Sequence, residues 1–410
     1  MAAPYDFSRA LPALIAFFLL AAVTLLAIGM ALTDRLNIGT PRSYFFIYLF
    51  VLLAIALLTV RKTKLTWAVL TLVFIEFFLA FVPYFLNQAG LNLNANLLPA
   101  ATNSRFVYHP LLQGVPKPNH TSTLPDGGSL THTSFGTRGP QPAEELLNSG
   151  ILINAFGGST TYDVAVSDEQ SWPNQLGLLL GSNVAVINRG VPAYTSADNL
   201  IQTMFYDKVN GRTPTCALYY EGWNDARNAH IPTPDTAYAD THVLSLVNEL
   251  QVRKGSGITP LMTILSQMPI IGQDTVPLPT NYPNIEVTGN QDPVLEDRFR
   301  NNIQSIIAVN NSKNVKSVFI GQILNKDALV GDTPGLIPNV PKNEVLTFIS
   351  GLNSIMKSEA ERLGAIYIDA NQASFTATDF VDEGHFSASG SAKFAKQISA
   401  QVQSACFATN

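Results

Sequence analysis

The chain of 410 residues is poor in charge and poor in the motifs that hold metals or nucleotides. Only 13% of its residues are charged, and 30 acidic residues outnumber 25 basic ones, for a net charge of −5. Such a chain offers no basic surface, so we expect no nucleic-acid partner. It has no cysteine and histidine cluster with metal-ligand spacing, no P-loop and no GxGxxG turn. We therefore expect neither a metal nor a cofactor.

Cysteine is also scarce. The two cysteines, Cys216 and Cys406, are too few to form a disulfide framework. Cys216 lies in a predicted core strand, whereas Cys406 lies near the C-terminus. This layout favours two free thiols, although outside the cytoplasm the two could pair.

The low charge reflects three apolar runs in the first ninety residues. They cover 11–32, 44–60 and 65–86, and the last contains a single charged residue, Glu76. Each run is close to the roughly 20 residues that cross a bilayer as a helix. A cleaved signal peptide would explain only the first run, which lacks a small-residue cleavage site. We therefore predict a membrane anchor of three transmembrane helices over 1–90, with the lipid bilayer as a partner.

Basic residues beside the runs predict the orientation of the anchor. Those on one side of the membrane are Arg9, Arg61, Lys62 and Lys64. The other side has two, Arg35 and Arg42, so the N-terminus is predicted to be cytoplasmic and the C-terminal domain periplasmic or extracellular. Glu76 in mid-membrane could mark a functional site. Protonation, or a partner within the bundle, accounts for it equally well.

After the anchor, the composition changes twice. Residues 91–148 are rich in Asn, Pro, Gly and Thr and are predicted to form an irregular extracytoplasmic connector with a hairpin. From 149 to 410, apolar runs alternate with amphipathic stretches, which is typical of a parallel sheet covered by helices on both faces. The span 226–291 fits no single crossover and is interpreted as an insertion. Predicted strands are 151–156, 184–188, 216–220, 315–320 and 365–369, and predicted helices are 168–180, 196–208, 292–311, 342–363 and 388–404.

Several candidate site residues fall at one edge of the predicted sheet. Ligands of open parallel sheets bind beyond the carboxyl ends of the strands. A Gly-Gly-Ser turn places Ser159 after the first strand, where glycine lets the backbone approach a substrate closely. Gly190 follows the second strand, Asn224 follows the third, and His385 comes after the fifth. The chain layout therefore predicts that these residues meet.

Together they have the chemistry of a serine hydrolase. Serine is a weak nucleophile that needs a base, and the base needs a third group to hold it. Asp382 lies three residues before His385, so its carboxylate can accept from Nδ1–H and leave Nε2 free for Ser159. The Asn224 amide and the Gly190 N–H could donate to an oxyanion. Taken singly, each feature is more commonly a turn, a cap or a solvated histidine.

These blocks occur in the order and strand positions of the SGNH (GDSL-like) hydrolase family, which residues 149–410 resemble. The blocks are Gly158-Ser159, Gly190, Gly222-x-Asn224-Asp225 and Asp382-x-x-His385. The resemblance implies a flavodoxin-like three-layer αβα sandwich with a five-stranded parallel sheet and acyl-ester chemistry. It implies that Ser159 is the nucleophile, His385 the general base and Asp382 its orienter. The oxyanion donors would be the N–H groups of Ser159 and Gly190 and the side chain of Asn224.

One departure from the family pattern points to a subgroup of the family. Gly158 stands where the family name has Asp, and Gly there is familiar in membrane-anchored members of cell-envelope glycan metabolism; 108–110 and 135–140 also resemble those members. We therefore expect a membrane-tethered esterase that removes acyl groups, chiefly O-acetyl, from an extracytoplasmic glycan or glycolipid. An O-acyltransferase, with 226–291 as a lid that excludes water, is one alternative. A non-catalytic glycan-binding or assembly protein is another.

Three aromatic side chains lie near these blocks. Tyr162, Tyr194 and Trp223 could stack on a sugar ring. Aromatic side chains beside apolar strands also bury a large area. We therefore favour core packing for each of them.

Overall fold

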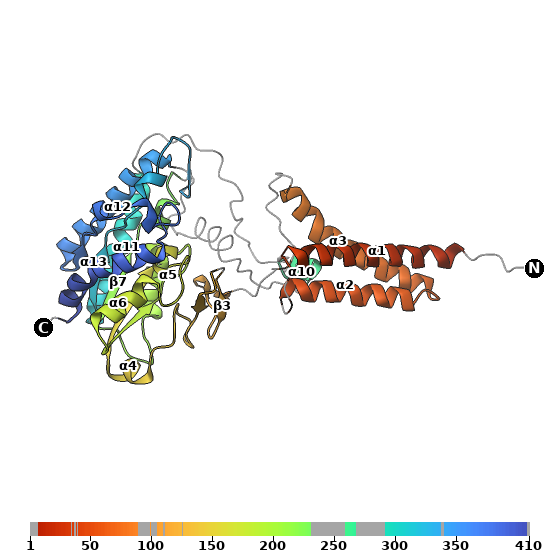
Figure 1. Cartoon of the computed structure of the whole chain (residues 1–410), viewed down its shortest axis with the longest axis horizontal. Helices are drawn as coiled ribbons and strands as arrows, with labels where there is room; N and C mark the ends of the chain where they lie inside the picture. The colour runs from red at the N-terminus through yellow and green to blue at the C-terminus, as the bar shows by residue number, and fades with distance from the viewer. Residues whose placement is uncertain are drawn as a thin grey trace, which may run out of the picture. The chain divides into compact units, whose positions relative to one another are not determined.

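The computed structural model describes residues 7–33, 35–36, 38, 40–88, 99, 105–109, 111–124, 126–230, 259–267, 292–337 and 340–407. The chain divides into two compact units (Figure 1). The helical unit comprises Met1–Ser104 and Arg253–Thr280, and the α/β unit comprises Arg105–Val252 and Asn281–Asn410. Most of the predicted insertion, 226–291, lies outside the described residues.

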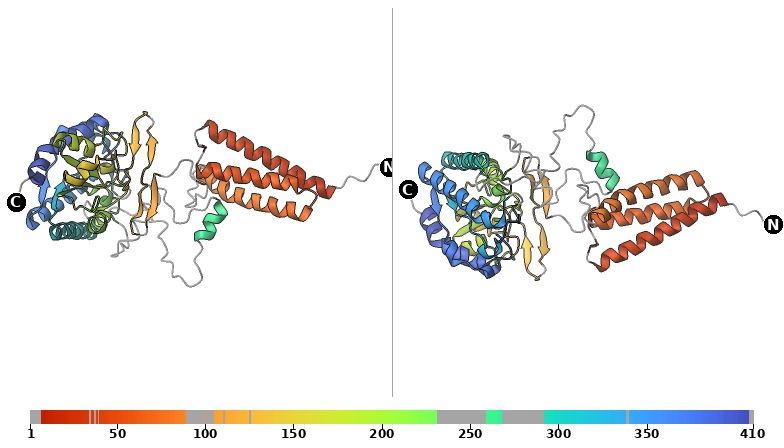
Figure 2. Two further views of the ribbon diagram at one scale, coloured as in Figure 1. Left: turned by 90° about the horizontal axis from the view of Figure 1, so that it is seen from below. Right: turned by 90° about the horizontal axis from the view of Figure 1, so that it is seen from above.

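The helical unit contains α1 (Phe7–Leu32), α2 (Pro41–Leu58) and α3 (Thr63–Gln88), which lie side by side (Figure 2). All three are long and apolar enough to cross a membrane. They match the predicted runs to within a few residues. The start of α2 has a local cause, because Thr40 caps the helix by accepting from Ser43 N and proline occupies the first position.

The α/β unit is built on a five-stranded parallel sheet. Its strands are β5 (Ile151–Gly157), β6 (Val184–Asn188), β7 (Cys216–Tyr220), β8 (Lys316–Ile320) and β9 (Ile366–Ile368). Their spatial order is β6-β5-β7-β8-β9, with every neighbouring pair parallel. In chain order this reads 2-1-3-4-5, the doubly wound order of flavodoxin-like folds. The predicted fold class is confirmed.

Helices cover both faces of this sheet. Successive side chains of a strand point to opposite faces, and here both sets are apolar and need to be buried. On β7, Ala217 and Tyr219 pack toward α11 and α12, while Leu218 and Tyr220 pack toward α6 and α13. The larger helices are α6 (Trp172–Leu180), α7 (Ser196–Phe205), α11 (Pro293–Ser312), α12 (Lys342–Leu363) and α13 (Ala388–Phe407). The shorter ones are α4 (Glu144–Ser149), α5 (Ser159–Tyr162), α8 (Trp223–Ala226), α10 (Pro260–Gln267), η1 (Lys326–Ala328), η2 (Gln372–Ser374) and η3 (Ala377–Asp379).

The predicted connector contains two antiparallel hairpins, not one. The first pairs β1 (Phe106–His109) with β2 (Gln113–Pro116), and the second pairs β3 (Thr121–Thr123) with β4 (Ser129–Thr131). An Asp-Gly-Gly turn closes the second hairpin, and the carboxylate of Asp126 accepts from the backbone N–H two residues on. The Asn-, Pro- and Gly-rich composition therefore marks turns between short strands.

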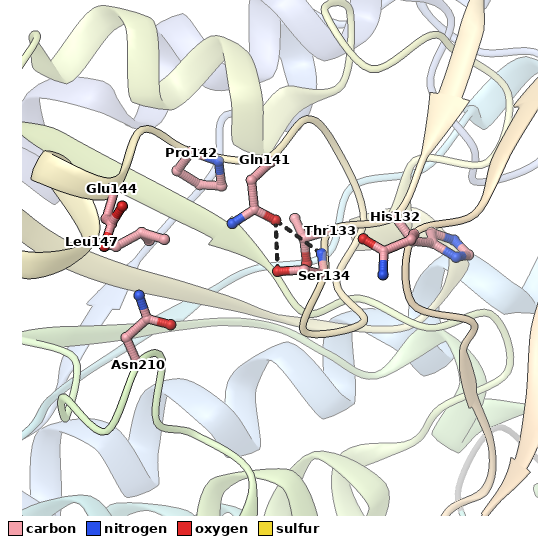
Figure 3. A pocket seen from close by; sticks show the side chains of 9 residues that line it. His132, Thr133, Ser134, Gln141, Pro142, Glu144, Leu147 and Asn210 are labelled. Atoms are coloured by element: carbon pink, nitrogen blue, oxygen red, sulfur yellow. Dashed lines mark hydrogen bonds between the residues drawn. The ribbon is translucent and has the colours of Figure 1, made fainter.

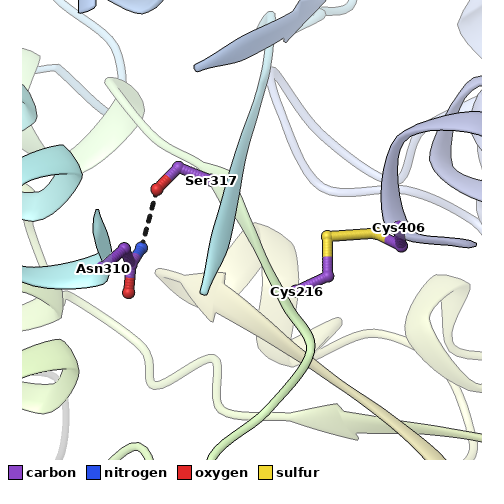
Figure 4. The surroundings of a disulfide bond; sticks show 4 residues. All are labelled: Cys216, Asn310, Ser317 and Cys406. Atoms are coloured by element: carbon purple, nitrogen blue, oxygen red, sulfur yellow. Dashed lines mark hydrogen bonds between the residues drawn. A yellow bond between two sulfur atoms is a disulfide. The ribbon is translucent and has the colours of Figure 1, made fainter. Parts of the chain in front are cut away.

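A disulfide joins Cys216 to Cys406, with their Cα atoms 5.5 Å apart (Figure 4). The expectation of two free thiols is wrong. Cys216 begins β7 and Cys406 belongs to the last turn of α13, and the α13 side of the sheet buries both. Their separation of 190 positions in the sequence hides this proximity from any local pattern.

We expect the disulfide to contribute substantially to the stability of the α/β unit. Closing so long a loop restricts the unfolded chain, and removing a native disulfide costs about 2–5 kcal/mol in small domains. Replacing both cysteines by serine should lower the melting temperature of the detergent-solubilised protein, as should reduction of the wild type. An unchanged melting temperature, together with two titratable thiols in the unreduced denatured protein, would contradict the assignment.

Candidate active site

The turn that carries Ser159, the predicted nucleophile, connects β5 to α5 through Gly157 and Gly158, and we call it the nucleophile turn. Gly157 has φ +152°, and a Cβ there would collide with the Tyr220 carbonyl oxygen. A Cβ on Gly158 would collide with the side-chain nitrogen of Asn224. Two glycines are thus needed for the turn to fit against the ends of neighbouring segments, and they leave Ser159 as the first residue of α5.

Ser159, His385 and Asp382 form a continuous chain of hydrogen bonds. His385 Nε2 lies 2.7 Å from Ser159 Oγ, and His385 Nδ1 lies 2.7 Å from Asp382 Oδ2. A carboxylate accepts from Nδ1–H, which assigns that tautomer to the ring and leaves Nε2 to accept the serine proton. The sequence predicts these three residues as a set, and the structure brings them into direct contact.

Asp382 is held in its ionised form. Burial disfavours its charge, but the hydrogen bond and charge of His385, together with backbone donors, outweigh that cost and lower the Asp382 pKa. Its Oδ1 accepts from the N–H groups of Gly384 at 2.9 Å and His385 at 2.8 Å. The same bonds fix the loop geometry, so the carboxylate both orients the ring and stabilises positive charge on it.

Asn224 lies beside the nucleophile turn. It belongs to α8, directly after Gly222, whose φ of +108° turns the chain at the end of β7. One hydrogen of its amide is donated to the Tyr194 carbonyl at 2.8 Å, and the nitrogen lies against Gly158. Among the described residues, the second amide hydrogen has no acceptor in the protein. In the described part of the chain, the Ser159 N–H has no acceptor.

The N–H of Gly190, predicted to be an oxyanion donor, has a partner within the protein. This N–H is donated to Asn188 Oδ1 at 2.9 Å. A Cβ at Gly190 would collide with the backbone of Thr161 and Tyr162. The geometry therefore gives this glycine a packing role, in which the end of β6 approaches the back of α5, and its N–H has a partner within the protein.

A buried carboxyl group, which sequence reasoning missed, supports the nucleophile turn. Asp163 follows α5 directly and adopts a left-handed conformation with φ 62°. Its Oδ2 accepts from Trp172 N at 2.8 Å and from Ser391 Oγ at 2.6 Å. Burial raises the pKa of Asp163 to about 7. These partners belong to α6 and α13, so no local motif signals the role.

The three aromatic residues near the blocks are core residues, as favoured from the sequence. Tyr162, Tyr194 and Trp223 are 0%, 1% and 3% exposed. Tyr194 donates its hydroxyl hydrogen to the Gly114 carbonyl at 2.6 Å, and the Trp223 ring packs against Gly384, the residue before His385. None of them presents an open face to a sugar ring.

A separate cavity of about 470 Å³ opens beside the loop between β4 and α4 (Figure 3). Gln141 lies on its wall and accepts from the backbone and side chain of Ser134. Its lining includes Asn210 but no member of the hydrogen-bonded chain at Ser159. Among the described residues, no group of three or more His, Cys, Asp or Glu could hold a metal ion.

Comparisons with known proteins find similar folds at low identity. No family model matches the chain, and no curated protein matches it. A lipolytic protein of the G-D-S-L family from Desulfitobacterium hafniense is 14% identical with a TM-score of 0.35, and the match covers 61% of this chain and 99% of that one. A GDSL-like lipase from Bacteroides thetaiotaomicron is 12% identical with a TM-score of 0.37, over 65% and 92%. A lipase/acylhydrolase from Enterococcus faecalis is 17% identical with a TM-score of 0.37, over 62% and 96%.

Likeness of this extent carries no conclusion about activity. What bears on activity is the hydrogen-bonded chain from Ser159 to Asp382 and the amide of Asn224 beside it. A serine, a histidine base, an orienting carboxylate and an oxyanion donor are the groups that acyl transfer requires.

The raised pKa of Asp163 predicts a specific dependence of stability on pH. The folded protein binds this proton up to pH about 7, whereas the ordinary pKa is 3.8. The folded state therefore holds more protons between these values, and the carboxyl makes the protein less stable as pH rises from about 4 to 7, by roughly 1.4 kcal/mol per pH unit. Asp163→Asn keeps an acceptor oxygen but carries no titrating proton.

The free energy of unfolding, followed through tryptophan fluorescence in urea, should therefore fall less steeply with pH in Asp163→Asn than in the wild type over this range. Parallel curves for the two proteins would show that Asp163 does not titrate as the structure indicates. Measurements at pH 8, above both pKa values, provide the reference for any change unrelated to protonation.

Proposed function

We propose that the protein is a membrane-tethered serine esterase that hydrolyses acyl esters, chiefly O-acetyl, on an extracytoplasmic glycan or glycolipid. The observation that carries the proposal is the 2.7 Å contact between His385 Nε2 and Ser159 Oγ, with Asp382 behind the ring. Ser159 is only 6% exposed, which favours a small acyl group at the nucleophile. No cofactor is needed for this reaction.

The first half of the reaction forms an acyl-enzyme. Ser159 Oγ attacks the ester carbonyl carbon while its proton passes to His385 Nε2, and Asp382 stabilises the resulting imidazolium. The carbonyl oxygen becomes an oxyanion that accepts from the Asn224 amide and the Ser159 N–H. Collapse of this intermediate breaks the bond to the leaving alkoxide, which takes the proton from His385 and departs as the glycan hydroxyl.

The second half regenerates the serine. Water attacks the acyl carbonyl carbon as His385 takes one of its protons, and the same donors hold the oxyanion. Collapse then returns the proton to Ser159 Oγ and releases the carboxylic acid. Because Asp382 has a lowered pKa, it stays ionised through both steps and serves only to orient and stabilise the imidazole.

Two observations support an extracytoplasmic location. The disulfide between Cys216 and Cys406 is a bond that persists in oxidising compartments. The basic residues around the apolar helices also favour a cytoplasmic N-terminus, with the α/β unit on the other side. A tethered enzyme in that location meets esters carried by surface glycans and glycolipids.

Replacing the nucleophile should abolish turnover. Ser159→Ala in the full-length protein should lower the hydrolysis of a short-chain aryl ester at least about 10³-fold, because the residual groups cannot form an acyl-enzyme. The wild type should also react with a fluorophosphonate probe, and the variant should not.

Unchanged turnover in Ser159→Ala would exclude the assignment, and failure of the folded wild type to take up the probe would favour a non-catalytic binding role. With an acetylated glycan as substrate and an added sugar acceptor, free acid is the expected product. If an acylated sugar forms preferentially, the protein is an O-acyltransferase and not an esterase.

The oxyanion assignment predicts a loss in the chemical step. Asn224→Ala should lower kcat by about 10²–10³-fold with a smaller effect on KM, because the donor is required mainly when the oxyanion forms. The melting temperature reports whether loss of the bond to Tyr194 has affected folding. A kcat within a few-fold of the wild type, in a folded variant, would remove Asn224 from the mechanism.

A further inference from the structure

Glu76 lies in the middle of an apolar helix and has a protein partner there. It belongs to α3, within a candidate span that covers Thr63–Leu86, and is 1% exposed. An acidic side chain at this depth of a span is costly unless something satisfies it. Its Oε2 accepts from the backbone N–H of Leu261 at 3.0 Å.

Leu261 belongs to the first turn of α10, which packs against α3 within the helical unit (Figure 2). The first N–H groups of any helix have no acceptor inside the helix. Here Thr259 Oγ1 accepts from Met262 N at 3.2 Å, and Glu76 accepts from Leu261 N. The accepting oxygen of Glu76 also lies at the positive end of the helix dipole.

The position of this contact along α3 sets the depth of α10. Glu76 stands ten residues before Leu86, the end of the candidate span. At 1.5 Å per residue this is about 15 Å of helix, half the thickness of a hydrocarbon core. A glutamate side chain reaches less far than this, so the first turn of α10 lies within the length of the span and not beyond its end.

The outer surface of α10 suits a lipid environment. Met262 and Leu265 are 52% and 56% exposed, and the neighbouring α3 exposes Phe74 and Phe78 to a similar extent, 59% and 51%. Both helices thus expose apolar side chains, and α3 is long enough to span a membrane. Within hydrocarbon, free N–H groups cost several kcal/mol each, which explains why a carboxyl group is placed to accept one.

We propose that α10 is a re-entrant membrane segment, with the acyl chains of the bilayer as the partner of its outer face and Glu76 as its anchor. In the chain, α10 lies between α8, which carries Asn224, and α11. The α/β unit is therefore connected to the membrane-embedded part both before its first strand and through this returning segment. The inference depends on α3 spanning the bilayer and is independent of the esterase activity.

Spin labels in liposomes test the location of α10. The full-length protein with Leu265→Cys is labelled and its collisions with oxygen, which enriches in lipid, and with a water-soluble nickel chelate are compared. Phe78→Cys on α3 provides the lipid-exposed control, and Leu178→Cys, on an α6 residue that is 70% exposed, provides the aqueous one. The native cysteines form the disulfide and do not react.

The label at 265 should resemble the one at 78, with oxygen access exceeding chelate access. Access to the chelate as high as at 178 would overturn the proposal.

Substitution of Glu76 tests the anchor. Glu76→Gln keeps an acceptor oxygen and should leave the label at 265 in lipid, whereas Glu76→Leu removes the acceptor and should raise its access to the chelate several-fold. The label at 78, measured in the same Glu76→Leu background, shows whether α3 itself remains inserted. If α3 stays inserted and the label at 265 does not change in Glu76→Leu, Glu76 does not anchor α10.

Discussion

The hydrogen bond between His385 Nε2 and Ser159 Oγ joins positions that lie 226 residues apart. It can form only if the turn after β5 and the loop before α13 reach the same edge of the sheet. The parallel order β6-β5-β7-β8-β9 meets this condition, since every strand points its carboxyl end to that edge. At this edge, Gly157 and Gly158 have no side chains, so the turn that carries Ser159 comes into contact with Tyr220 and Asn224.

Those parts of the site that depend on chain order and short spacing could be predicted from the sequence. Strand ends placed Ser159 and Asn224 at one edge, and the three-residue spacing of Asp382 and His385 matched a carboxylate that orients an imidazole. The partner of the Gly190 N–H could not be predicted, because a turn motif does not indicate whether the nearby Asn188 side chain accepts this hydrogen bond. Contacts across long separations, such as the disulfide and the partners of Asp163, depend on how helices pack onto the sheet.

Two carboxyl groups near His385 have opposite environments. Asp382 gains donors from His385 and from backbone amides, so its pKa is lowered despite partial burial. Asp163 is fully enclosed behind the turn that carries Ser159, and burial raises its pKa to about 7 although Ser391 and Trp172 donate to it. Of the two, only Asp382 contacts the imidazole of His385. Asp163 instead supports the turn that carries Ser159 through its bonds to Trp172 and Ser391.

Asp163 also illustrates a device that recurs in the chain, in which a buried carboxyl accepts from the first turn of a helix to which it does not belong. Asp163 accepts from Trp172 N at the start of α6, and Asp225 from Ser196 N at the start of α7. Glu76 does the same for Leu261 in α10. Free N–H groups at helix starts need acceptors wherever water is absent. In the α/β unit the protein interior excludes the water, and in the helical unit the bilayer would do so, which gives Glu76 a structural reason to occupy an apolar span.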